Sequence, residues 1–390
     1  MNRFILIVMI GILFLLGACS NTENTQYAED HKKQERQITI EKEYFETKPK
    51  ITSIKLAAIG DMLIHGIVYN DAKTEAGFDF SPMLEQVAPY LSEPTIAMAN
   101  QETMIGGEEV GLSTYPRFNS PYQVGDALDK AGVDIVTLAN NHTLDVGEKA
   151  IQNALNHWDQ IGMLYTGAYR DQKDSERIRV METEAGIDVS FLGYTYGTNG
   201  IPVPAGKDYL VNLINHEEIA ADVKAAEEIS DITVMNLHFG AEYQRMPNDD
   251  QKELVQYVAD LGVDIIMGHH PHVLQPMEWI EGKGGNKTFV VYSLGNFLSG
   301  QDEFYRRIGG MVEVTIEKKV TRDEEKIQIV TPRFLPTFVD YDENIPRNDF
   351  QVIPMYQLDE TVLPAADRHY QEIKKHMSQW MPEVEFIESE

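Results

Sequence analysis

The chain of 390 residues contains only one cysteine, Cys19. With one thiol no disulfide can form within the chain, so packing and any bound metal must stabilise the fold. The long apolar run at the N-terminus, Phe4–Leu16, is shorter than the roughly 20 residues that a membrane-spanning helix needs. The sequence also lacks internal repeats and low-complexity segments, which excludes solenoid and fibrous architectures.

The sequence also contains few basic residues. The chain has 33 Lys and Arg residues against 62 Asp and Glu residues, giving a formal charge of −29 and a pI near 4.7. This balance argues against non-specific binding of nucleic acid or anionic lipid by the protein surface. Anionic substrates remain compatible with it, because bound cations can reverse the field inside a site.

The N-terminus has the pattern of an export signal. A basic start, the apolar run and the segment Leu16-Gly17-Ala18-Cys19 resemble a bacterial lipoprotein signal peptide, in which the cysteine is lipidated. We therefore expect residues 1–19 to be a signal peptide and Cys19 to anchor the protein to the extracytoplasmic face of the bacterial cell membrane. An uncleaved signal anchor is the alternative.

Composition divides the remainder of the chain into three parts. Residues 20–50 are polar and charged, as expected for a flexible tether. Residues 51–345 should form the folded domain, and residues 346–390 an acidic C-terminal extension. The hydrophobic content of 43% is ample for a core of this size.

Strand-like and helical patterns alternate along the folded part. Apolar residues at helical spacing predict helices at Tyr122–Ala131, Glu148–Ile161, Glu217–Ile229 and Asp249–Leu261, with a weaker helix at Ala365–Met377. Such alternation predicts an α/β domain with a largely parallel sheet. Past Thr288, we expect antiparallel strands that complete or extend the second half of the fold, at Lys287–Tyr292, Gly310–Glu317 and Lys326–Pro332.

Five strand-like segments run directly into polar clusters. The segments read IKLAAIG-Asp61-MLI-His65, TIAMA-Asn100-Gln101-Glu102, VDIVTLA-Asn140-Asn141-His142, DITVMNL-His238 and VDIIMG-His269-His270-Pro271-His272. Parallel strands place such ends along one edge of a sheet, where ligands of open α/β sheets bind. Oxygen and imidazole donors suit Zn, Mn or Fe. The five clusters together predict a metal centre, with two ions.

The first two clusters each have a plain alternative. Asp61 is either a ligand, with His65 converging on the same ion, or a helix cap or turn residue. Asn100 and Glu102 point to the same side if their strand continues, and Glu102 is then placed to bridge two cations. The alternative for this pair is a solvated strand end.

The later clusters are more specific. We expect Asn141 to offer an amide oxygen to a metal, His142 to act as general acid and Asp145 to orient it; the alternative is turn chemistry that caps the following helix. His238 has Glu242 as a possible orienting carboxylate, although a lone histidine is more often structural. His270 and His272, separated by a proline of fixed φ, suit chelation.

The ordered set of motifs resembles the CapA family, which is associated with poly-γ-glutamate capsule synthesis and belongs to the calcineurin-like metallophosphatase superfamily. The resemblance runs from about Ile54 to Phe297. It depends on the following series: Gly60-Asp61…His65, Asn100-x-Glu102, Asn140-Asn141-His142-x-x-Asp145-x-Gly147, His238-x-Gly240-x-Glu242-Tyr243, His270-Pro271-His272 and Ser293-Leu294-Gly295-Asn296-Phe297. The fold that it implies is a four-layer αββα sandwich.

The resemblance also implies roles. Asp61 and His272 would bind one ion, and Glu102 would bridge the two ions in a place usually held by aspartate. The second ion would be held by Asn141, His238 and His270, with His142 as general acid. The usual Asp-x-His spacing is replaced by Asp61-x-x-x-His65, so the resemblance does not make His65 a ligand. We expect five further residues to line the pocket: His65, Asn100, Asn140, Glu242 and Asn296.

Two functions follow from these expectations. The first is a membrane-anchored, two-metal hydrolase that acts on a phosphoester or an amide. The alternative is a non-catalytic accessory protein for the synthesis, export or attachment of the capsule polymer, working with membrane proteins of capsule synthesis. Polyanion binding would then need the metals or local cations. The candidates are Arg117, Arg245, Arg306 and Arg307, which are otherwise ordinary surface residues.

Overall fold

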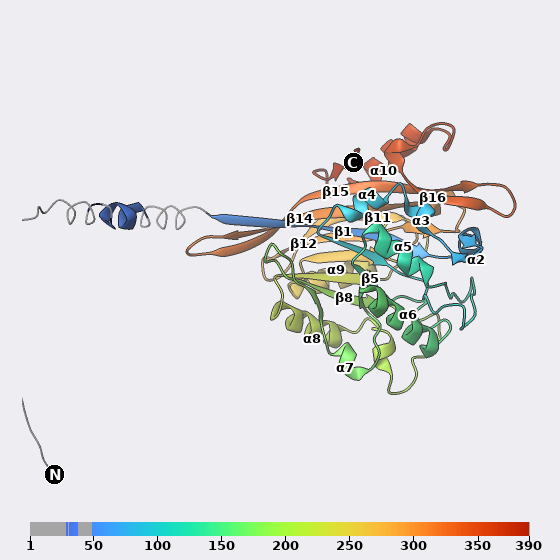
Figure 1. The fold of residues 1–390 in the computed structure, drawn as a ribbon, viewed down its shortest axis with the longest axis horizontal. Helices are drawn as coiled ribbons and strands as arrows, with labels where there is room; N and C mark the ends of the chain where they lie inside the picture. Colours follow the sequence, from blue (N-terminus) through green and yellow to red (C-terminus); the bar gives the residue numbers. More distant parts are fainter. Residues whose placement is uncertain (1–28, 30, 38–48, 390) are drawn as a thin grey trace, which may run out of the picture. The chain divides into compact units, whose positions relative to one another are not determined.

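The computed structural model describes residues 29, 31–37 and 49–389 (Figure 1). The chain divides into two compact units. One comprises Met1–Lys50 and Val320–Glu325, and the other comprises Ile51–Lys319 and Lys326–Glu390. In the first unit, residues 31–37 are helical. Cys19, the signal peptide at 1–19 and most of the tether at 20–50 lie outside the described residues. Within the described part, no helix is both long and apolar enough to cross a membrane.

The first of two large sheets has nine strands in the described part of the chain. Seven follow one another from edge to edge, in the order β16 (Asn348–Pro354), β15 (Glu325–Asp342), β14 (Ile308–Val320), β1 (Lys50–Leu63), β4 (Ile96–Asn100), β5 (Ile135–Thr137) and β6 (Leu164–Thr166). In addition, β13 (Asn296–Ser299) pairs with β1, and β17 (Glu385–Phe386) pairs with β15. Four neighbouring strands of this sheet, β1, β4, β5 and β6, run parallel.

The second sheet has six strands, in the order β11 (Leu274–Glu281), β12 (Lys287–Leu294), β10 (Ile265–His269), β9 (Ile232–His238), β8 (Val189–Thr195) and β7 (Arg179–Met181). Its four central strands are parallel, and both edge strands are antiparallel to their neighbours. A short hairpin, β2 (Lys73–Thr74) with β3 (Gly77–Phe78), stands apart.

The helices of the second unit are α2 (Gly66–Asp71), α3 (Ser81–Leu84), α4 (Ala88–Ser92), α5 (Gln123–Ala131), α6 (Glu148–Ile161), α7 (Gln172–Ser175), α8 (His216–Glu227), α9 (Asp249–Asp260) and α10 (Ala366–Met377). Three 3₁₀ turns, η1 (Asp208–Leu210), η2 (Phe304–Arg307) and η3 (Met355–Gln357), complete the set.

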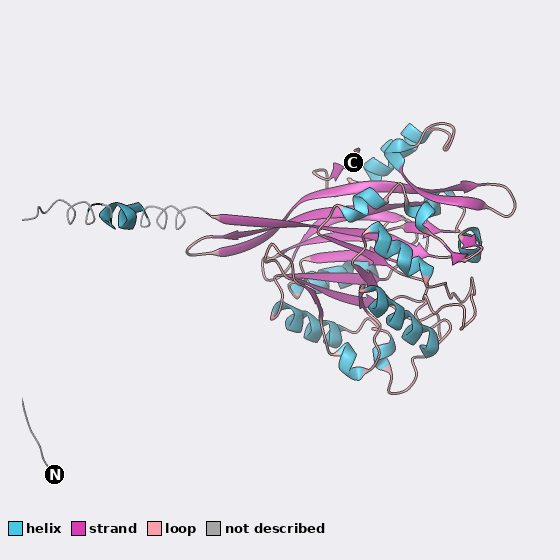
Figure 2. Ribbon diagram, in the orientation of Figure 1, coloured by secondary structure: helices cyan, strands magenta, loops and turns pink. Residues whose placement is uncertain are grey.

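Side-chain alternation along the strands builds four layers. In β1, Leu56 and Ala58 face a core that also contains Phe191 and Val234 of the second sheet, so the two sheets pack face to face. The intervening residues of β1 point the other way, into a core shared with the helices from α2 to α6. The outer face of the second sheet packs on α8 and α9 in a third core. Figures 1 and 2 show the strands in the middle of the folded part, with helices around them.

This arrangement confirms the α/β class and the αββα sandwich. The predicted helices are also confirmed: α5, α6, α8, α9 and α10 lie within two residues of the expected bounds. The helix α9 begins with a capping box, in which Asn248 and Gln251 exchange hydrogen bonds with each other's backbone, and its first turn carries Asp249 and Asp250.

The expectation for the strands after Thr288 was wrong in part. Lys287–Tyr292 does belong to the second sheet, but it runs parallel to β10 and antiparallel only to β11. Gly310–Glu317 and Lys326–Pro332 fall in β14 and β15, which extend the first sheet beside β1. The chain returns to the first sheet through β13, which pairs with β1. Local sequence marks a strand but does not say which strand lies beside it.

An aspartate precedes three of the parallel strands and joins each to its neighbour. Asp134 accepts a hydrogen bond from the backbone N–H of Ala97 (2.8 Å), Asp231 from that of Asp188 (3.0 Å), and Asp264 from that of Thr233 (2.9 Å). The repeated Asp-Ile step in the sequence therefore fixes the entry of β5, β9 and β10 beside the preceding strand.

Residues 346–390 belong to the same compact unit as Ile51–Lys319. Within them, β16 forms an outer strand of the first sheet, and α10 contributes Tyr370, Ile373 and Met377 to the core between the sheets. These residues are acidic in composition, but most of their apolar positions are buried.

Candidate metal centre

The polar clusters predicted at the strand ends meet at one place. Asp61 lies in β1, Glu102 follows β4, and His238 ends β9. Six residues were expected to bind metal, and the structure buries all of them: Asp61, Glu102, Asn141, His238, His270 and His272. The carboxyl ends of parallel strands from both sheets share this edge, as the strand order requires.

Close backbone contact between β1 and β13 fixes the position of Asp61. Asp61 pairs in register with Asn296, and its backbone N–H donates to the carbonyl of Gly295 at 2.8 Å. A Cβ on Gly60 would lie 2.0 Å from that same carbonyl oxygen, so only glycine fits there. Asp61 is thus part of a strand, and its alternative role as a helix cap or turn residue is wrong.

The Asp61 carboxylate is held by three side chains. Asn100 donates to Oδ1 at 2.8 Å, His272 Nδ1 lies 3.0 Å from Oδ2, and His269 Nδ1 lies 3.5 Å from Oδ1. Burial acts to raise the pKa of Asp61, but the neighbouring imidazoles of His269 and His272 outweigh it and hold the pKa well below its usual range. The carboxylate is therefore ionised at neutral pH.

Glu102 lies among imidazoles without a partner of its own. Its Oε1 is 3.6 Å from His238 Nε2, 3.7 Å from His272 Nε2 and 4.0 Å from His142 Nε2. Neither carboxylate oxygen has a hydrogen-bond partner among the described residues, although both are fully buried. Burial raises the pKa of Glu102 well above its usual range. A buried carboxylate in this state is costly unless something compensates it.

Asn141 and His238 contact each other directly. His238 Nε2 lies 2.7 Å from Asn141 Oδ1, and Asn141 Nδ2 donates to Asn199 Oδ1 at 3.2 Å. Burial lowers the pKa of His238 well below its usual range, so its imidazole is neutral and available as a ligand. The amide orientation of Asn141 is set by Asn199, which keeps the oxygen on the side of the cluster.

His270 and His272 have unusual backbone conformations. Both have positive φ, 95° and 57° respectively, a region that non-glycine residues enter at a cost on the order of 1 kcal/mol. Burial lowers the pKa of His270 to about 3. Burial also opposes the charging of His272, but Glu102 and Asp61 outweigh it and raise its pKa to about 9. The turn at Pro271 thus presents two imidazoles to the same carboxylates.

These residues fit a divalent cation. Glu102, His270 and His272 each offer a ligand atom, and the three atoms lie within 4.8 Å of one another. The unpartnered oxygens of Glu102 and the unpartnered Nδ1 of His270 are buried at this point. A cation accepts all of these donors at once, which removes the cost of burying them unpaired.

His142 and Asp145 form a pair beside the cluster. His142 Nδ1 lies 2.7 Å from Asp145 Oδ2, which also accepts a hydrogen bond from the backbone N–H of Phe118 at 2.7 Å. The other nitrogen, Nε2, lies on the side of Glu102. The expected contact between His142 and Asp145 is present, and the arrangement suits a proton donor that is oriented by a carboxylate. The alternative, capping of α6, is wrong, because Gly147 caps that helix without a side chain.

The five expected pocket residues behave differently. Asn100 contacts Asp61, and Asn296 Oδ1 lies 3.1 Å from His272 Nδ1. Asn140 instead stabilises its own turn, because its Oδ1 accepts from the N–H of His142 and its Nδ2 donates to backbone carbonyls. His65 turns its Nδ1 to the carbonyl of Leu63 and the N–H of Gly300, and Glu242 is exposed on a nearby loop.

Two residues of the cluster were not predicted. His269 was noted only as part of the histidine run, and it contacts both Asp61 and Asn236. Asn199 follows β8 in a loop, with a positive φ of 50°, and lies against both Asn141 and His142. A Thr-Asn-Gly turn is common in loops, so the sequence carried no signal for this role.

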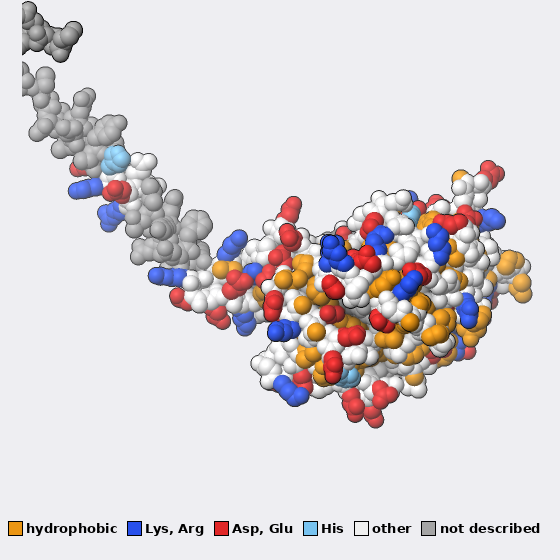
Figure 3. All heavy atoms as spheres, turned by 90° about the horizontal axis from the view of Figure 1, so that it is seen from below, with side chains coloured by type: hydrophobic (Ala, Val, Ile, Leu, Met, Phe, Trp, Pro, Cys, Tyr) orange, Lys and Arg blue, Asp and Glu red, His pale blue; other side chains and the backbone are white. Residues whose placement is uncertain are grey.

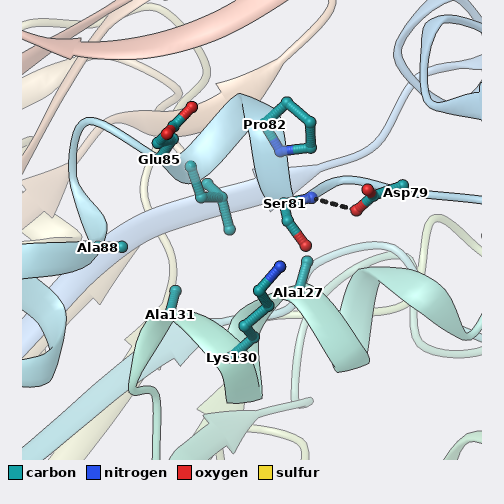
Figure 4. Close-up of a pocket in the computed structure, with 9 residues that line it drawn as sticks. Asp79, Ser81, Pro82, Glu85, Ala88, Ala127, Lys130 and Ala131 are labelled. Carbon is teal, nitrogen blue, oxygen red and sulfur yellow. Dashed lines mark hydrogen bonds between the residues drawn. The ribbon is translucent and has the colours of Figure 1, made fainter.

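A cavity of about 260 Å³ opens beside His142 and Asn141, between them and the segment Tyr115–Arg117. A larger one, of about 640 Å³, is lined in part by Tyr196, whose ring lies 4.7 Å from that of His270. By contrast, the groove in Figure 4, around Asp79, Ser81 and Lys130, contains none of the predicted site residues. The chemistry of the molecule is thus concentrated at the strand ends.

A two-sheet sandwich with a buried set of carboxylate, amide and imidazole ligands at its strand ends is the architecture of the metallophosphatase type. Comparison with known families then specifies which one. Residues 55–301 match the family model described as "Bacterial capsule synthesis protein PGA_cap", and the chain belongs to this family.

Three named relatives are similar to the chain. "PGA biosynthesis protein CapA" of Bacillus subtilis is 30% identical over 48% of this chain and 48% of its own length, so the match spans about half of that relative. "Capsule biosynthesis protein CapA" of Bacillus anthracis is 26% identical over 77% of this chain and 69% of its own length. A Mycobacterium tuberculosis protein named "Probable polyglutamine synthesis accessory protein Rv0574c" is 22% identical over 45% of this chain and 47% of its own.

Among solved structures, one from Staphylococcus aureus, named "Putative 5'-Nucleotidase" and in complex with alpha-ketoglutarate, covers 83% of this chain and 58% of its own at 14% identity. Its TM-score is 0.44, which is too low to support an argument about function.

Proposed function

We propose that the protein acts in the biosynthesis of a poly-γ-glutamate capsule as a metal-dependent hydrolase of a phosphoester or an amide. The observation that carries the hydrolase is Glu102, a fully buried carboxylate whose two oxygens have no partner, surrounded by three imidazoles. Membership of the capsule synthesis family supports the biological role. The names of the two Bacillus relatives point in the same direction.

Two divalent cations, Mn, Zn or Fe, are proposed for the centre. Asp61 and His272 are suited to hold one, Asn141, His238 and His270 the other, and Glu102 to bridge them. When bound, the cations would supply Lewis-acid stabilisation of the reacting oxygens and a nucleophile at neutral pH. The buried side chains around them hold the ligands in place.

The protein's own acid–base group in this proposal is His142. Its Nδ1–H donates to Asp145, which leaves Nε2 to carry the proton that goes to the leaving group. Asp145 is itself held by the backbone of Phe118, and the Phe118 ring lies edge-on to His142 with centroids 4.7 Å apart. Together these contacts fix both the tautomer and the plane of the imidazole.

The test pairs metal analysis with turnover. The full-length chain, purified in detergent, should contain close to two ions and should hydrolyse a generic chromogenic phosphodiester after Mn, Zn or Fe is added. In His142→Ala, kcat should fall by about 10²- to 10⁴-fold, while elemental analysis finds the wild-type metal content. Metal without turnover in the wild-type protein would exclude a phosphodiester hydrolase.

That last outcome would favour the second candidate, an accessory protein in polymer synthesis, export or attachment, which works with membrane proteins of capsule synthesis. The name of the Mycobacterium relative supports this candidate. A capsule assay separates the two: an accessory role should survive His142→Ala but not the loss of Asp61 or His272. In either case, we propose that the protein is anchored through Cys19 at the extracytoplasmic face of the membrane.

A further inference from the structure

We propose that Arg117 binds a negatively charged group of the substrate, a carboxylate or a phosphate, in the cavity beside His142. The proposal rests on the proposed function, because it assigns a part of the same site. The cavity measures about 260 Å³ and is bounded by His142 and Asn141 on one side and by Tyr115, Pro116 and Arg117 on the other. A group held by Arg117 would therefore lie next to the proton donor and a metal ligand.

The loop that carries Arg117 is anchored at several points. Asn119 is fully buried, and its side chain accepts from the N–H of Gly106 and donates to the carbonyls of Gly107 and Gly111. Thr114 accepts a hydrogen bond from the backbone N–H of Gly66, which begins α2. The side chains of Thr114 and Asn119 thus hold the two ends of the segment that carries Arg117.

The strongest anchor joins the loop to the site itself. The backbone N–H of Phe118, the residue next to Arg117, donates to the carboxylate oxygen of Asp145 that lies 2.7 Å from His142 Nδ1. The position of Arg117 is therefore fixed relative to the proton donor. The guanidinium of Arg117 is a planar fork of N–H donors, which suits a carboxylate or a phosphate.

Arg117 also differs from the other candidate arginines. Arg245 pairs with Glu372 and lies over Tyr305, Arg306 pairs with Glu303 and lies over Tyr243, and Arg307 pairs with Asp340. Arg117 lines the cavity and forms no ion pair with any described residue. In a chain with a formal charge of −29, an unpaired cation beside a catalytic group is a site for an external anion.

One acidic residue opposes this cation. Glu242 lines the same cavity from another loop and is exposed, so it repels an anion that Arg117 attracts. The other carboxylate, Asp145, is already engaged by His142 and Phe118. Removing the charge of Arg117 should therefore weaken anion binding, and removing the charge of Glu242 should strengthen it. If the loop had only a structural role, the two substitutions would not have opposite effects.

The experiment is calorimetric titration of the full-length, Mn-loaded protein in detergent with two probes, a γ-linked glutamate trimer and inorganic phosphate. We expect R117Q to weaken binding of at least one probe by about tenfold or more and E242Q to strengthen it. Metal content should stay at the wild-type level in both. The control is R177Q, because Arg177 is also exposed but lies at a different cavity.

The two probes identify the source of the charge. A loss confined to the trimer assigns a carboxylate, a loss confined to phosphate assigns a phosphate, and a loss of both assigns a shared anion site. The proposal is overturned if R117Q binds both probes like the wild type, if R177Q weakens binding equally, or if the wild type binds neither. Phosphodiester turnover, measured in parallel, tests the hydrolase separately, since binding can be present without it.

Discussion

At the scale of single residues, Glu102 is the side chain on which the centre depends. Its oxygens are buried and have no hydrogen-bond partner among the described residues, so we expect it to destabilise the metal-free protein and to act as a ligand when a cation binds. The same side chain therefore has opposite effects on stability in the two states. A substitution that keeps the shape of the Glu102 side chain but removes its charge separates these two effects.

The first prediction is for Glu102→Gln. In the presence of a chelator, the free energy of unfolding should change by less than about 1 kcal/mol or should rise, because no buried charge remains. The rise in Tm on addition of excess Mn, which reflects binding to the native state, should be lost. Denaturation of both forms with and without metal measures this. Glu75→Gln, at an exposed position, should keep the wild-type response. A full metal-induced rise in Glu102→Gln would contradict the assignment.

Most of this centre could be predicted from the sequence, but not all of it. Asp61, His238 and His270 follow apolar strands directly, and strand ends must meet at one edge of the sheet. Asn199 and Arg117 are in loops, whose positions depend on anchors such as Asn119 and Asp145 that are distant in the chain. Their side chains are ordinary for loops, so only the folded structure brings them to the site.

At the scale of elements, the entry of three parallel strands, β5, β9 and β10, depends on an aspartate. Burial raises the pKa of Asp264 to about 6, above the value of about 4 expected in an unfolded chain. The folded state therefore favours the protonated form. The stability that this proton provides is fully present below about pH 4 and is lost as the pH rises through about 6.

The second prediction follows from that sign. Asp264→Asn, which is neutral at every pH and keeps an oxygen for the N–H of Thr233, should raise the free energy of unfolding by on the order of 2 kcal/mol at pH 8. The gain should shrink toward zero as the pH falls to about 4. Denaturant unfolding across this range measures it, with the exposed Asp323→Asn as control. A gain that does not vary with pH would refute the explanation.

The third prediction concerns the contact between β1 and β13. In Gly60→Ala, the new Cβ would lie 2.0 Å from the carbonyl oxygen of Gly295, so the two strands must separate. We expect a loss of about 3 kcal/mol or more in the free energy of unfolding, together with weaker metal binding, because Asp61 moves with its strand. Gly197→Ala is the control: a Cβ there meets no atom within 4 Å. Equal stability of the two variants would argue against the close contact.

The bounds of helices and strands were predicted better than the pairing of strands within the sheets. The periodicity of α5, α6 and α9 gave their bounds closely, since an amphipathic pattern is local. The membership of β14 and β15 in the first sheet was not predicted, because strand pairing depends on residues far apart in the chain. The β1–β13 contact, which returns the chain to that sheet, is of this kind.

At the scale of the whole molecule, the net charge bears on the proposed anchoring. On the face shown in Figure 3, acidic and basic side chains are interspersed, and the chain as a whole is strongly acidic. Such a protein is repelled by an anionic membrane. Attachment to the membrane is therefore expected to depend on the lipid at Cys19 and not on the protein surface.

The fourth prediction tests that dependence. In a bacterial host, Cys19→Ala should leave less of the chain in the membrane fraction than the wild type, and the purified variant should not bind vesicles of anionic phospholipid at physiological salt. Fractionation and vesicle sedimentation measure the two effects. Unchanged membrane retention of Cys19→Ala would instead support the alternative of an uncleaved signal anchor.

The pairing of Asp61 with His272 joins positions that are 211 residues apart in the chain, and β13 adds Asn296 beside them. Contacts of such separation form late in folding. A nascent or truncated chain that ends before residue 296 would contain every proposed ligand but would have no β13 to hold Asp61 in place. The protein should thus acquire its metal only after the domain is finished, and the metal supply of the compartment where folding ends should decide which ion it carries.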